Sequence, residues 1–390
     1  MADYDAIILG AGAAGLMCAA VAGQRGRRVL LVDHADEAGK KILISGGGRC
    51  NFTNVHTAAD RYLSANPHFA KSALGRYTAA DFIALVESYG IDWHEKTLGQ
   101  LFCDGSAKQI VAMLLDECAK GRVDWSLARA VTGVAHDGEG YRVSLDGRDV
   151  TAPALVIATG GPSIPKMGAT GFAYDLARQF GLKIVEPRPA LVPLTLGGDE
   201  TLFRSLSGVA ADVVASCGKT AFREAALFTH RGLSGPAILQ VSSYWRNGQP
   251  VGIDFMPDRE PGWLQNAKRA TPRATLRKTL AAALPDRLAE TLADRLGLVS
   301  ELSALTDKKL ADAERALSHW NFTPNGSEGY AKAEVTAGGI STAELSSQTM
   351  QAKRVKNLYA VGEAVDVTGW LGGYNFQWAW ASGWAAGQVL

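Results

Sequence analysis

Cysteine is scarce in this sequence and is not arranged for disulfide or metal binding. Only five cysteines occur among 390 residues, and they form neither a CxxC pair nor a zinc-type spacing. A disulfide framework and a structural metal are therefore not expected. We predict a cytoplasmic protein that keeps its thiols reduced and holds no metal ion.

Charge of one sign and long uninterrupted hydrophobic runs are also lacking. Lys and Arg number 40 against 39 Asp and Glu, so the formal net charge is only +1 and no global field attracts nucleic acid or an anionic membrane. The uncharged stretches 6–24 and 367–390 are broken by glycines and polar residues. We expect both to be buried in a globular core and predict no membrane partner. Nothing in the sequence indicates an oligomeric state.

Glycine and apolar residues are abundant. The 43 glycines are about 11% of the chain, against a usual ~7%, and they gather in short clusters. Apolar side chains make up 47%, which is enough for a large core, and the length fits one main domain with insertions. The glycine clusters suit tight turns and close backbone approach, and they point to nucleotide binding.

The chain opens with a strand–helix–strand pattern, which is typical of a nucleotide-binding α/β domain. The expected elements of this part, in chain order, are strands at 5–9 and 28–32 around a helix at 16–24, helices near 78–90 and 106–120, hairpin-like strands over 122–151, and buried strands at 155–158 and 358–361.

Prolines at 187, 189 and 193 mark the start of a different region, because proline neither continues a helix nor donates in a central strand. This region is strand-like over about 191–256 and then helical. The helical periodicity lies in two sets, Leu288, Leu292 and Leu296, and Leu310, Ala313, Leu317 and Trp320. We therefore expect 1–190 and 330–390 to form one domain, interrupted by a substrate or cap domain at 191–329 whose helical part spans about 258–320.

A GxGxxG sequence, Gly10–Gly15, lies between the first strand and the first helix, and Asp33 closes the next strand. In this context Gly10 permits the turn, Gly12 lets the backbone reach a pyrophosphate, and Gly15 allows close helix packing. A carboxylate at Asp33 accepts from ribose hydroxyls and repels a 2′-phosphate. The site therefore favours FAD or NAD over NADP.

The other end of the chain favours FAD. A strand ends in Gly362-Glu363, the arrangement with which FAD proteins hold the ribityl chain. Gly372-Gly373 then opens a helix whose N-terminus would face the flavin N1 and C2 carbonyl, where negative charge develops on reduction. The aromatic row Phe376, Trp380 and Trp384 along this helix is expected to be core.

With these residues the sequence resembles a known family, the BaiN/RdsA-like flavoproteins, also described as YhiN-like or aminoacetone-oxidase-like. The resemblance runs nearly end to end and rests on the segments 39–54, 158–161, 228–236, 334–340 and 362–383. It implies an α/β fold: a glutathione-reductase-like FAD-binding Rossmann domain interrupted by a β-rich domain that carries a helical subdomain.

The resemblance also implies the cofactor contacts. They are Gly10, Gly12, Ala14, Gly15, Asp33, His34, Lys40, Lys41, Ser45, Gly46, Gly47, Gly48, Arg49, Cys50, Asn51, the backbone near Val131, Thr159, Gly160, Gly161, Gly362, Glu363, Gly373, Tyr374, Asn375 and Phe376. Ser45–Gly48 is a run of small residues that can bring N–H groups to the cofactor. Arg49 either offsets phosphate or substrate charge or serves as an internal ion-pair partner.

Two further absences limit the chemistry. Cys50 has no second redox cysteine beside it, so dithiol exchange is not expected; it is either a proton donor or a packing residue.

No second GxGxxG follows a strand, since 168–171 lacks both the pattern and the preceding strand. NADH or NADPH would therefore dock transiently over the flavin as electron donor, unless another donor replaces it.

Reduction of a conjugated C=C bond needs a hydride from flavin N5, a proton donor and a hydrogen-bond donor for the developing oxyanion. His230, in a Thr-His-x-Gly-x-Ser-Gly-Pro turn, is the first candidate, and Tyr374 is the second. Either could instead be a structural group.

A basic run on the inserted region is the one local charge feature. It comprises Lys268, Arg269, Arg273, Arg277 and Lys278. Such a run is commonly a solvated helix face, and the alternative is phosphate contact with ribosomal RNA.

Three functions remain open. The first is an FAD-dependent, NAD(P)H-using reductase of a conjugated C=C bond, either rRNA uridine to dihydrouridine or a small unsaturated carbonyl compound. The second is an FAD oxidase of a small amine such as aminoacetone, which passes electrons to O2. The third is an RNA-binding or assembly protein in which FAD is structural.

Overall fold

The computed structural model describes residues 2–390, which divide into two compact units. The first unit runs to Arg188 and resumes at Glu334, and the second comprises Pro189–Ala333. The sequence predicts these boundaries at 190 and 330, where the proline cluster and the return of glycine-rich sequence lie.

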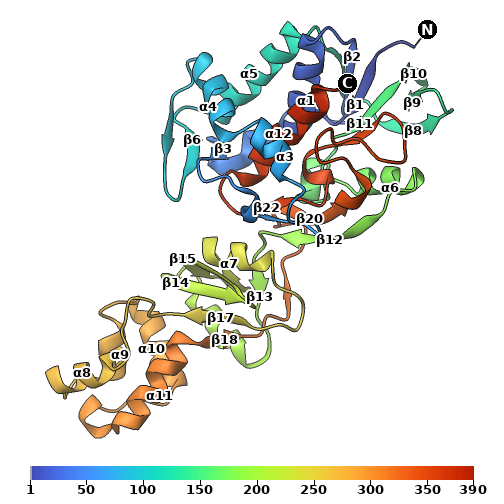
Figure 1. The fold of residues 1–390 in the computed structure, drawn as a ribbon. Coiled ribbons are helices and arrows are strands. Elements are labelled where there is room, and N and C mark those ends of the chain that lie inside the picture. The colour runs from blue at the N-terminus through green and yellow to red at the C-terminus, as the bar shows by residue number, and fades with distance from the viewer. Residues whose placement is uncertain (1) are drawn as a thin grey trace. The chain divides into compact units, whose positions relative to one another are not determined.

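A five-stranded parallel sheet with the order β21-β11-β1-β2-β7 organises the first unit (Figure 1). Its strands are β1 (Ala6–Leu9), β2 (Val29–Val32), β7 (Asp124–Ser126), β11 (Ala154–Ile157) and β21 (Leu358–Ala360). All residues of β1, β2 and β11 are buried, as expected for a parallel sheet covered on both faces. Since β21 comes from the C-terminal segment and pairs with β11, the two ends of the chain share one sheet.

The other elements of this unit surround the sheet. They are α1 (Ala13–Gln24), α2 (Lys40–Ile44), η1 (Ser45–Gly48), β3 (Asn51–Asn54), η2 (Ala59–Arg61), β4 (Tyr62–Leu63), α3 (Lys71–Arg76), α4 (Ala79–Ser88), β5 (Trp93–Glu95), β6 (Gln100–Cys103), α5 (Ala107–Lys120), β8 (Val131–His136), β9 (Tyr141–Leu145), β10 (Arg148–Ala152), η3 (Pro165–Met167), α6 (Phe172–Gln179), β12 (Ile184–Ala190), β20 (Val335–Ile340), η6 (Thr342–Glu344), η7 (Gly362–Ala364), β22 (Thr368–Gly369) and α12 (Tyr374–Gly387).

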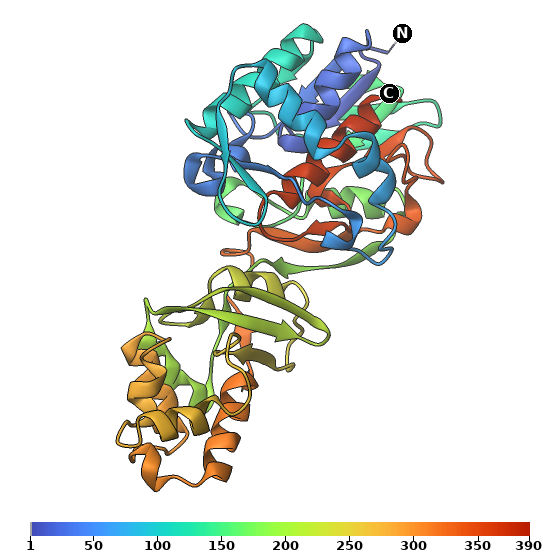
Figure 2. The same cartoon turned by 60° about the vertical axis from the view of Figure 1, so that its left-hand side comes forward.

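The first and last helices pack closely together, as Figure 2 shows for α1 and α12. Glycines make this approach possible, because a Cβ at Gly387 would lie 2.8 Å from Val21 Cβ, and one at Gly383 would overlap Ala14 O. Arg25 Nη1 donates to Gly387 O at 2.9 Å, and Arg27 Nε donates to Leu390 O at 2.8 Å. The C-terminal end is thereby fixed to the start of the chain.

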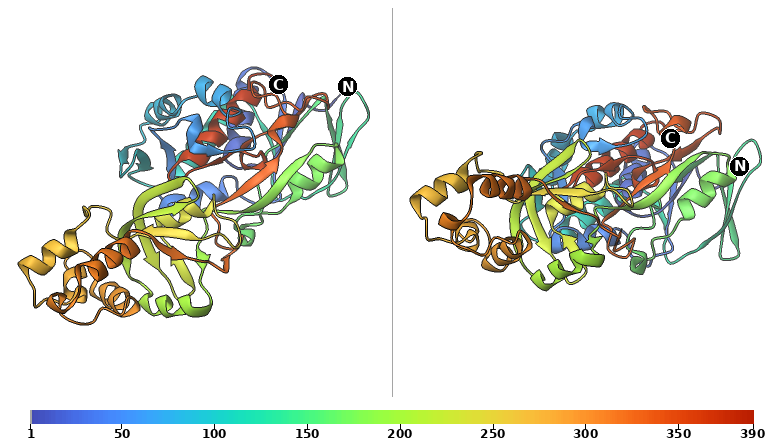
Figure 3. Two further views of the ribbon diagram at one scale, coloured as in Figure 1. Left: turned by 60° about the horizontal axis from the view of Figure 1, so that its bottom comes forward. Right: turned by 90° about the horizontal axis from the view of Figure 1, so that it is seen from below.

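The second unit contains a seven-stranded sheet, order β18-β17-β14-β15-β16-β13-β19, and a group of helices (Figure 3). Its elements are β13 (Leu194–Thr195), η4 (Gly198–Leu206), β14 (Ala210–Cys217), β15 (Thr220–Phe228), β16 (Gly232–Ser234), α7 (Pro236–Ser242), β17 (Val251–Asp254), α8 (Trp263–Ala270), α9 (Leu276–Leu280), α10 (Asp286–Arg295), η5 (Leu302–Ala304), α11 (Asp307–Ser318), β18 (Trp320–Phe322) and β19 (Gly326–Ser327).

The sequence-based elements are largely confirmed, with two differences in this unit. The stretch expected to be strand-like contains the helix α7, which begins at Pro236 directly after Gly235 with φ +86°, a favourable helix start. Trp320, assigned to the periodicity of α11, lies in β18 instead. The helix ends at Ser318, and Trp320 pairs with Ile253 of β17, so sheet pairing overrides the helical spacing.

No helix among residues 2–390 is long and apolar enough to cross a membrane. Within the same residues, no group of three or more His, Cys, Asp or Glu is arranged to hold a metal ion.

Candidate functional site: a dinucleotide cradle in the first unit

The three glycines of the GxGxxG turn have three different surroundings. Gly10 has φ +107°, and a Cβ there would lie 2.5 Å from Ala158 O at the end of β11. A Cβ at Gly15 would overlap Gly10 O, so α1 packs directly on the turn. Gly12 has no atom within 4 Å of its Cβ position, although its φ of −84° would accept a side chain. The space beside Gly12 is where a pyrophosphate would meet the free N–H groups at the start of α1.

Asp33, after β2, is held by backbone N–H groups from two sides. Its Oδ2 accepts from Ala11 N in the glycine turn at 2.7 Å, and its Oδ1 accepts from Ala35 N at 2.8 Å. The backbone N–H of Arg129 donates to Asp33 O at 3.1 Å, which brings the segment before Val131 next to Asp33. His34 Nδ1 lies 3.3 Å from Asp33 Oδ1. The carboxylate is thus fixed at the edge where an adenosine ribose would bind.

The segment 45–51 follows α2 as a glycine-rich turn. Gly46, Gly47 and Gly48 all have left-handed φ, and a Cβ at Gly47 would meet no atom within 4 Å. Arg49 is exposed and forms no ion pair with any described carboxylate. Its charge is therefore available to a phosphate or a substrate, which favours that hypothesis over the internal ion pair.

Cys50 lies at the end of this turn and is buried. Burial raises the pKa of its thiol to about 12, and a hydrogen bond with Ser45 acts in the opposite direction. The thiol therefore stays protonated at neutral pH and is a poor nucleophile. These surroundings favour the packing role.

All five cysteines of the chain are buried and free, which leads to a prediction. In the native protein, less than one mole of thiol per mole of protein should react with Ellman's reagent within minutes at pH 8, because burial keeps the five thiols protonated and covered. In guanidinium chloride all five should react. If one thiol of the native protein reacts rapidly and Cys50→Ser abolishes that reaction, the packing role assigned to Cys50 is wrong.

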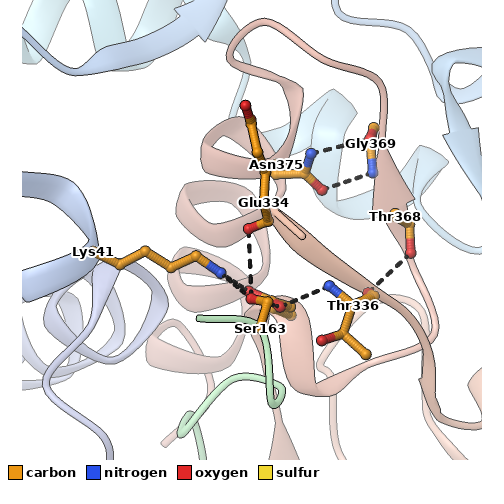
Figure 4. A network of polar contacts seen from close by, with 8 residues as sticks. Lys41, Ser163, Glu334, Thr336, Thr368, Gly369 and Asn375 are labelled. Atoms are coloured by element: carbon orange, nitrogen blue, oxygen red, sulfur yellow. Dashed lines mark hydrogen bonds and ion pairs between the residues drawn. The ribbon is translucent and has the colours of Figure 1, made fainter. Parts of the chain in front are cut away.

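Glu363, which follows β21, is the centre of a polar network whose other members Lys41, Ser163 and Thr336 are labelled in Figure 4. Its Oε2 accepts from Lys41 Nζ at 2.6 Å, and its Oε1 accepts from Ser163 Oγ at 2.8 Å and from Thr336 N at 2.9 Å. Lys41 Nζ also donates to Ser163 Oγ at 2.6 Å. Three other segments of the chain therefore orient one carboxylate, whose side chain is 20% exposed.

Sequence reasoning proposed Lys41 and Glu363 as separate cofactor contacts, and the fold brings them into one ion pair. It missed Ser163 and Thr336, which hold the carboxylate. A sequence signal existed for Thr336, which lies in the segment 334–340 on which the family resemblance rests, whereas Ser163 lies after β11 and outside those segments. Lys40 differs from Lys41: it forms a 2.6 Å ion pair with Asp36, which raises its pKa.

Glu334 lies beside this network (Figure 4). Surrounding protein raises the pKa of its carboxyl, while the ammonium of Lys41 acts in the opposite direction. The residue nevertheless remains accessible to solvent. A carboxyl with a raised pKa close to Lys41 and Glu363 is a group that sequence analysis did not single out.

The N-terminus of α12 begins where predicted and lies against the segment after the glycine-rich turn. A Cβ at Gly373, φ +95°, would overlap Thr53 O and lie 2.9 Å from Asn51 Oδ1. Asn375 uses its side chain internally, accepting from Gly369 N at 2.8 Å and donating to Gly369 O at 3.0 Å (Figure 4). A cofactor contact at Asn375 would therefore come from its backbone.

Of the aromatic row on this helix, Trp380 is core, as expected, whereas Phe376 and Trp384 are only partly buried and pack against the core. Trp380 is fully buried, stacks on Phe82 and on Phe376, and donates to Phe52 O. Tyr374 is 5% exposed and packs edge-on against Tyr62 and Trp370. Its role as a proton donor stays a prediction.

The carboxyl end of β11 adds two features. Gly160 has φ +72° and no atom within 4 Å of a Cβ position, while the neighbouring Thr159 Oγ1 is buried without a hydrogen-bond partner. An orphaned hydroxyl next to open space is the kind of group that a ligand satisfies. Together with the space at Gly12 and the fixed Asp33 and Glu363, these residues fit an FAD molecule.

His230, the other proposed proton donor, belongs to the second unit. It is exposed in the turn between β15 and β16, where Thr229 Oγ1 accepts from Arg231 N and Gly232 N at 3.2 and 3.0 Å. The hydroxyl of Thr229 thus shapes the turn that presents His230 and Arg231 to solvent.

The basic run of the second unit is partly neutralised. Lys268 pairs with Asp307 at 2.9 Å, and Arg277 pairs with Glu290 at 2.7 Å. Arg273 and Lys278 are exposed and form no ion pair within residues 2–390.

Comparison with known proteins decides the family. The family described as HI0933-like protein Rossmann domain matches residues 4–389. The chain belongs to this HI0933-like family of FAD-binding Rossmann proteins. Membership establishes a flavoprotein oxidoreductase with FAD as its cofactor.

Relatives of this HI0933-like protein carry two names. It is 54% identical to the ribosomal RNA dihydrouridine synthase of Escherichia coli (strain K12), over 100% of this chain and 98% of that protein. It is 46% identical to the protein of the same name from Haemophilus influenzae (strain ATCC 51907 / DSM 11121 / KW20 / Rd), over 99% of this chain and 98% of that protein. A 3-dehydro-bile acid delta(4,6)-reductase from Clostridium scindens (strain ATCC 35704 / DSM 5676 / VPI 13733 / 19) is 29% identical over 98% of each chain.

Among solved structures, the 3-ketosteroid-delta4-(5alpha)-dehydrogenase from Rhodococcus jostii RHA1 is similar in fold. The TM-score is 0.51 at 11% identity, and the match covers 99% of this chain and 98% of that chain. At this identity the likeness concerns the fold alone.

Proposed function

We propose that this protein is an FAD-dependent reductase that converts a uridine of ribosomal RNA to dihydrouridine. The observation that carries the proposal is the 54% identity to a ribosomal RNA dihydrouridine synthase, which extends over the whole chain and 98% of the relative. Such a substrate would place the protein in the cytoplasm.

The reaction adds two hydrogens to the C=C bond of uracil: a hydride at one carbon and a proton at the other. FAD, held at the cradle of the first unit, would supply the hydride. The network around Glu363 would fix the ribityl chain, and the start of α12 would stabilise negative charge near the flavin N1.

We assign the proton donor to His230, with Tyr374 as the second candidate. His230 has the advantage of exposure, whereas Tyr374 is buried against two aromatic rings. A protonated imidazole donates readily near neutral pH, which suits a general acid. Cys50, with its pKa raised to about 12, is the weakest of the three candidates.

NADH or NADPH is the proposed electron donor, and it would dock transiently because only one GxGxxG turn is present between a strand and a helix. In the overall balance, NAD(P)H and one proton convert uridine to dihydrouridine and NAD(P)⁺. Arg269, Arg273 and Lys278 are the exposed members of the basic run that form no ion pair within residues 2–390, and they would contact RNA phosphates.

A small unsaturated carbonyl compound is the second candidate substrate. It is favoured by the 29% identity to a 3-dehydro-bile acid delta(4,6)-reductase over nearly the full length of both chains. The chemistry is closely related, because both reactions saturate a C=C bond conjugated to a carbonyl group.

The deciding experiment compares dihydrouridine in ribosomal RNA from cells with and without this gene. We expect loss of dihydrouridine at one position, restored by the wild-type gene and not by a His230→Ala variant. Unchanged ribosomal RNA would contradict the proposal and favour a small-molecule substrate. Flavin occupancy of the variant, measured on the purified protein, must equal that of the wild type for the comparison to be valid.

A further inference from the structure

The second unit contains a pocket of about 310 Å³ that none of the functions discussed so far uses. It is lined by Thr195, Arg204, Arg231 and Asn325, all of them polar and two of them cationic. All four residues belong to the same compact unit.

Strand pairing brings these four residues together. Thr195 of β13 pairs with Gly232 of β16 on one side and with Gly326 of β19 on the other. A Cβ at Gly232 would overlap Leu194 O, so glycine at this position lets the His230–Arg231 turn approach β13. Arg204 joins from η4 and donates through Nη2 to Leu196 O.

The pocket presents hydrogen-bond donors. Thr195 Oγ1 donates to Asn325 Oδ1 at 2.7 Å, which occupies the amide oxygen and directs the amide NH₂ away from this bond. Arg204 Nε is buried and has no hydrogen-bond partner among the described residues. A buried guanidinium donor without an acceptor costs free energy, and an anionic ligand would supply the missing acceptor.

The pocket also carries uncompensated positive charge. Arg231 Nη1 lies 3.5 Å from Glu328 Oε2, and this is its only ion pair in the described chain. The Arg204 guanidinium has no carboxylate within ion-pair distance in residues 2–390. Two guanidinium groups against one carboxylate leave one positive charge, which matches the single negative charge of a phosphodiester.

We propose that the Thr195–Arg204–Arg231–Asn325 pocket binds a phosphate group of the ligand that this protein acts on. Paired guanidinium groups together with an amide donor form the chemistry that recognises phosphate. The phosphate comes either from the RNA strand or from the nicotinamide dinucleotide. Since His230 precedes Arg231 in the same turn, a phosphate bound here anchors the ligand next to the proposed acid. The inference rests on the proposed function for the identity of the ligand, but not for the presence of the phosphate site.

The test uses the full-length, FAD-loaded protein and two probes. One probe is a fluorescein-labelled, uridine-containing RNA oligonucleotide, followed by anisotropy at several salt concentrations. The other is NADH or NADPH, followed by the concentration dependence of flavin reduction. The variants are Arg231→Gln, which removes the exposed guanidinium, and Asn325→Asp, which replaces an amide donor with an anion. Arg223→Gln is the matched control, because Arg223 is 57% exposed, as Arg231 is 56% exposed, but lies outside the pocket.

We expect both pocket variants to bind one of the two probes about tenfold more weakly or worse, as for a lost charge-assisted hydrogen bond. If RNA is the source, the salt dependence of binding should also fall by about one phosphate contact for Arg231→Gln. A defect confined to the dinucleotide identifies the donor as the source. In each case Arg223→Gln should behave as wild type.

The proposal is overturned if both pocket variants fold and bind both probes as tightly as the wild-type protein does. It is also overturned if the wild-type protein binds neither probe. Folding is checked by thermal melting. The outcome is separable from the proposed function, because binding is measured without turnover. If the pocket variants bind the dinucleotide more weakly while ribosomal RNA from cells without the gene is unchanged, the phosphate site is supported and the RNA substrate is rejected.

Discussion

A Gly12→Asp variant is expected to fold normally and to be colourless. Gly12 has φ −84° and no atom within 4 Å of its Cβ position, so the protein itself has room for the new side chain. The added carboxylate would occupy the space for the pyrophosphate and repel it. Two unit charges about 4 Å apart near a protein surface interact by about 4 kcal/mol, which corresponds to about a thousandfold weaker FAD binding.

The measurement is flavin absorbance after gel filtration, together with the melting temperature of the flavin-free forms. Gly75→Asp is the matched control, because Gly75 is exposed on α3, also has no atom within 4 Å of its Cβ position, and lies outside the cradle. This control should retain flavin. Gly15→Val should behave oppositely to Gly12→Asp and fail to fold, since its Cβ would overlap Gly10 O. A yellow Gly12→Asp protein would refute the cradle.

A Glu363→Ala variant should lose flavin for a different reason. The substitution removes the carboxylate that Lys41, Ser163 and Thr336 N orient and leaves the Lys41 ammonium without its partner. Hydrogen bonds to charged groups contribute about 1.5–3 kcal/mol, so FAD affinity should fall about 10- to 100-fold. The dissociation constant is measured by titrating the flavin-free protein with FAD.

Two variants separate the ribityl contact from a general loss of structure. Glu363→Gln keeps the size and one acceptor oxygen, so it should lose less affinity than Glu363→Ala. Ser163→Ala removes one hydrogen bond to the carboxylate without changing its charge, and should weaken FAD binding by at most about tenfold. If Glu363→Ala retains wild-type affinity, the assignment of Glu363 to the ribityl chain is wrong.

Local sequence predicted the nucleotide half of the protein well, because the relevant signals are local. The order of strand, GxGxxG turn, helix and Asp33 follows from periodicity and from the spacing of glycines, and each of the three glycines has the surroundings that its role requires. The return of this domain at the C-terminal end also left a sequence signal, in the glycine-rich character of 331–390.

Other features of the site carried little local signal. Ser163 lies in no motif, and the importance of Ser163 and Thr336 arises from contact with Glu363 across 200 and 27 residues of chain. Trp320 fits a helical period perfectly and is nevertheless in a strand, because pairing with β17 is a long-range interaction. The partial neutralisation of the basic run by Asp307 and Glu290 likewise depends on packing between helices.

The sequence by itself determined the cofactor class, the interrupted domain order and the start of the C-terminal helix α12, since turns, caps and strand ends are encoded over a few neighbouring residues. Only the tertiary structure decided which Lys and Arg side chains form ion pairs within the chain and which do not. Lys41 and Lys268 are paired, whereas Arg49, Arg204 and Arg273 have no carboxylate partner in the described chain. The physical reason is that an ion pair depends on a distance of a few ångströms between residues that the chain separates widely, and folding alone sets that distance.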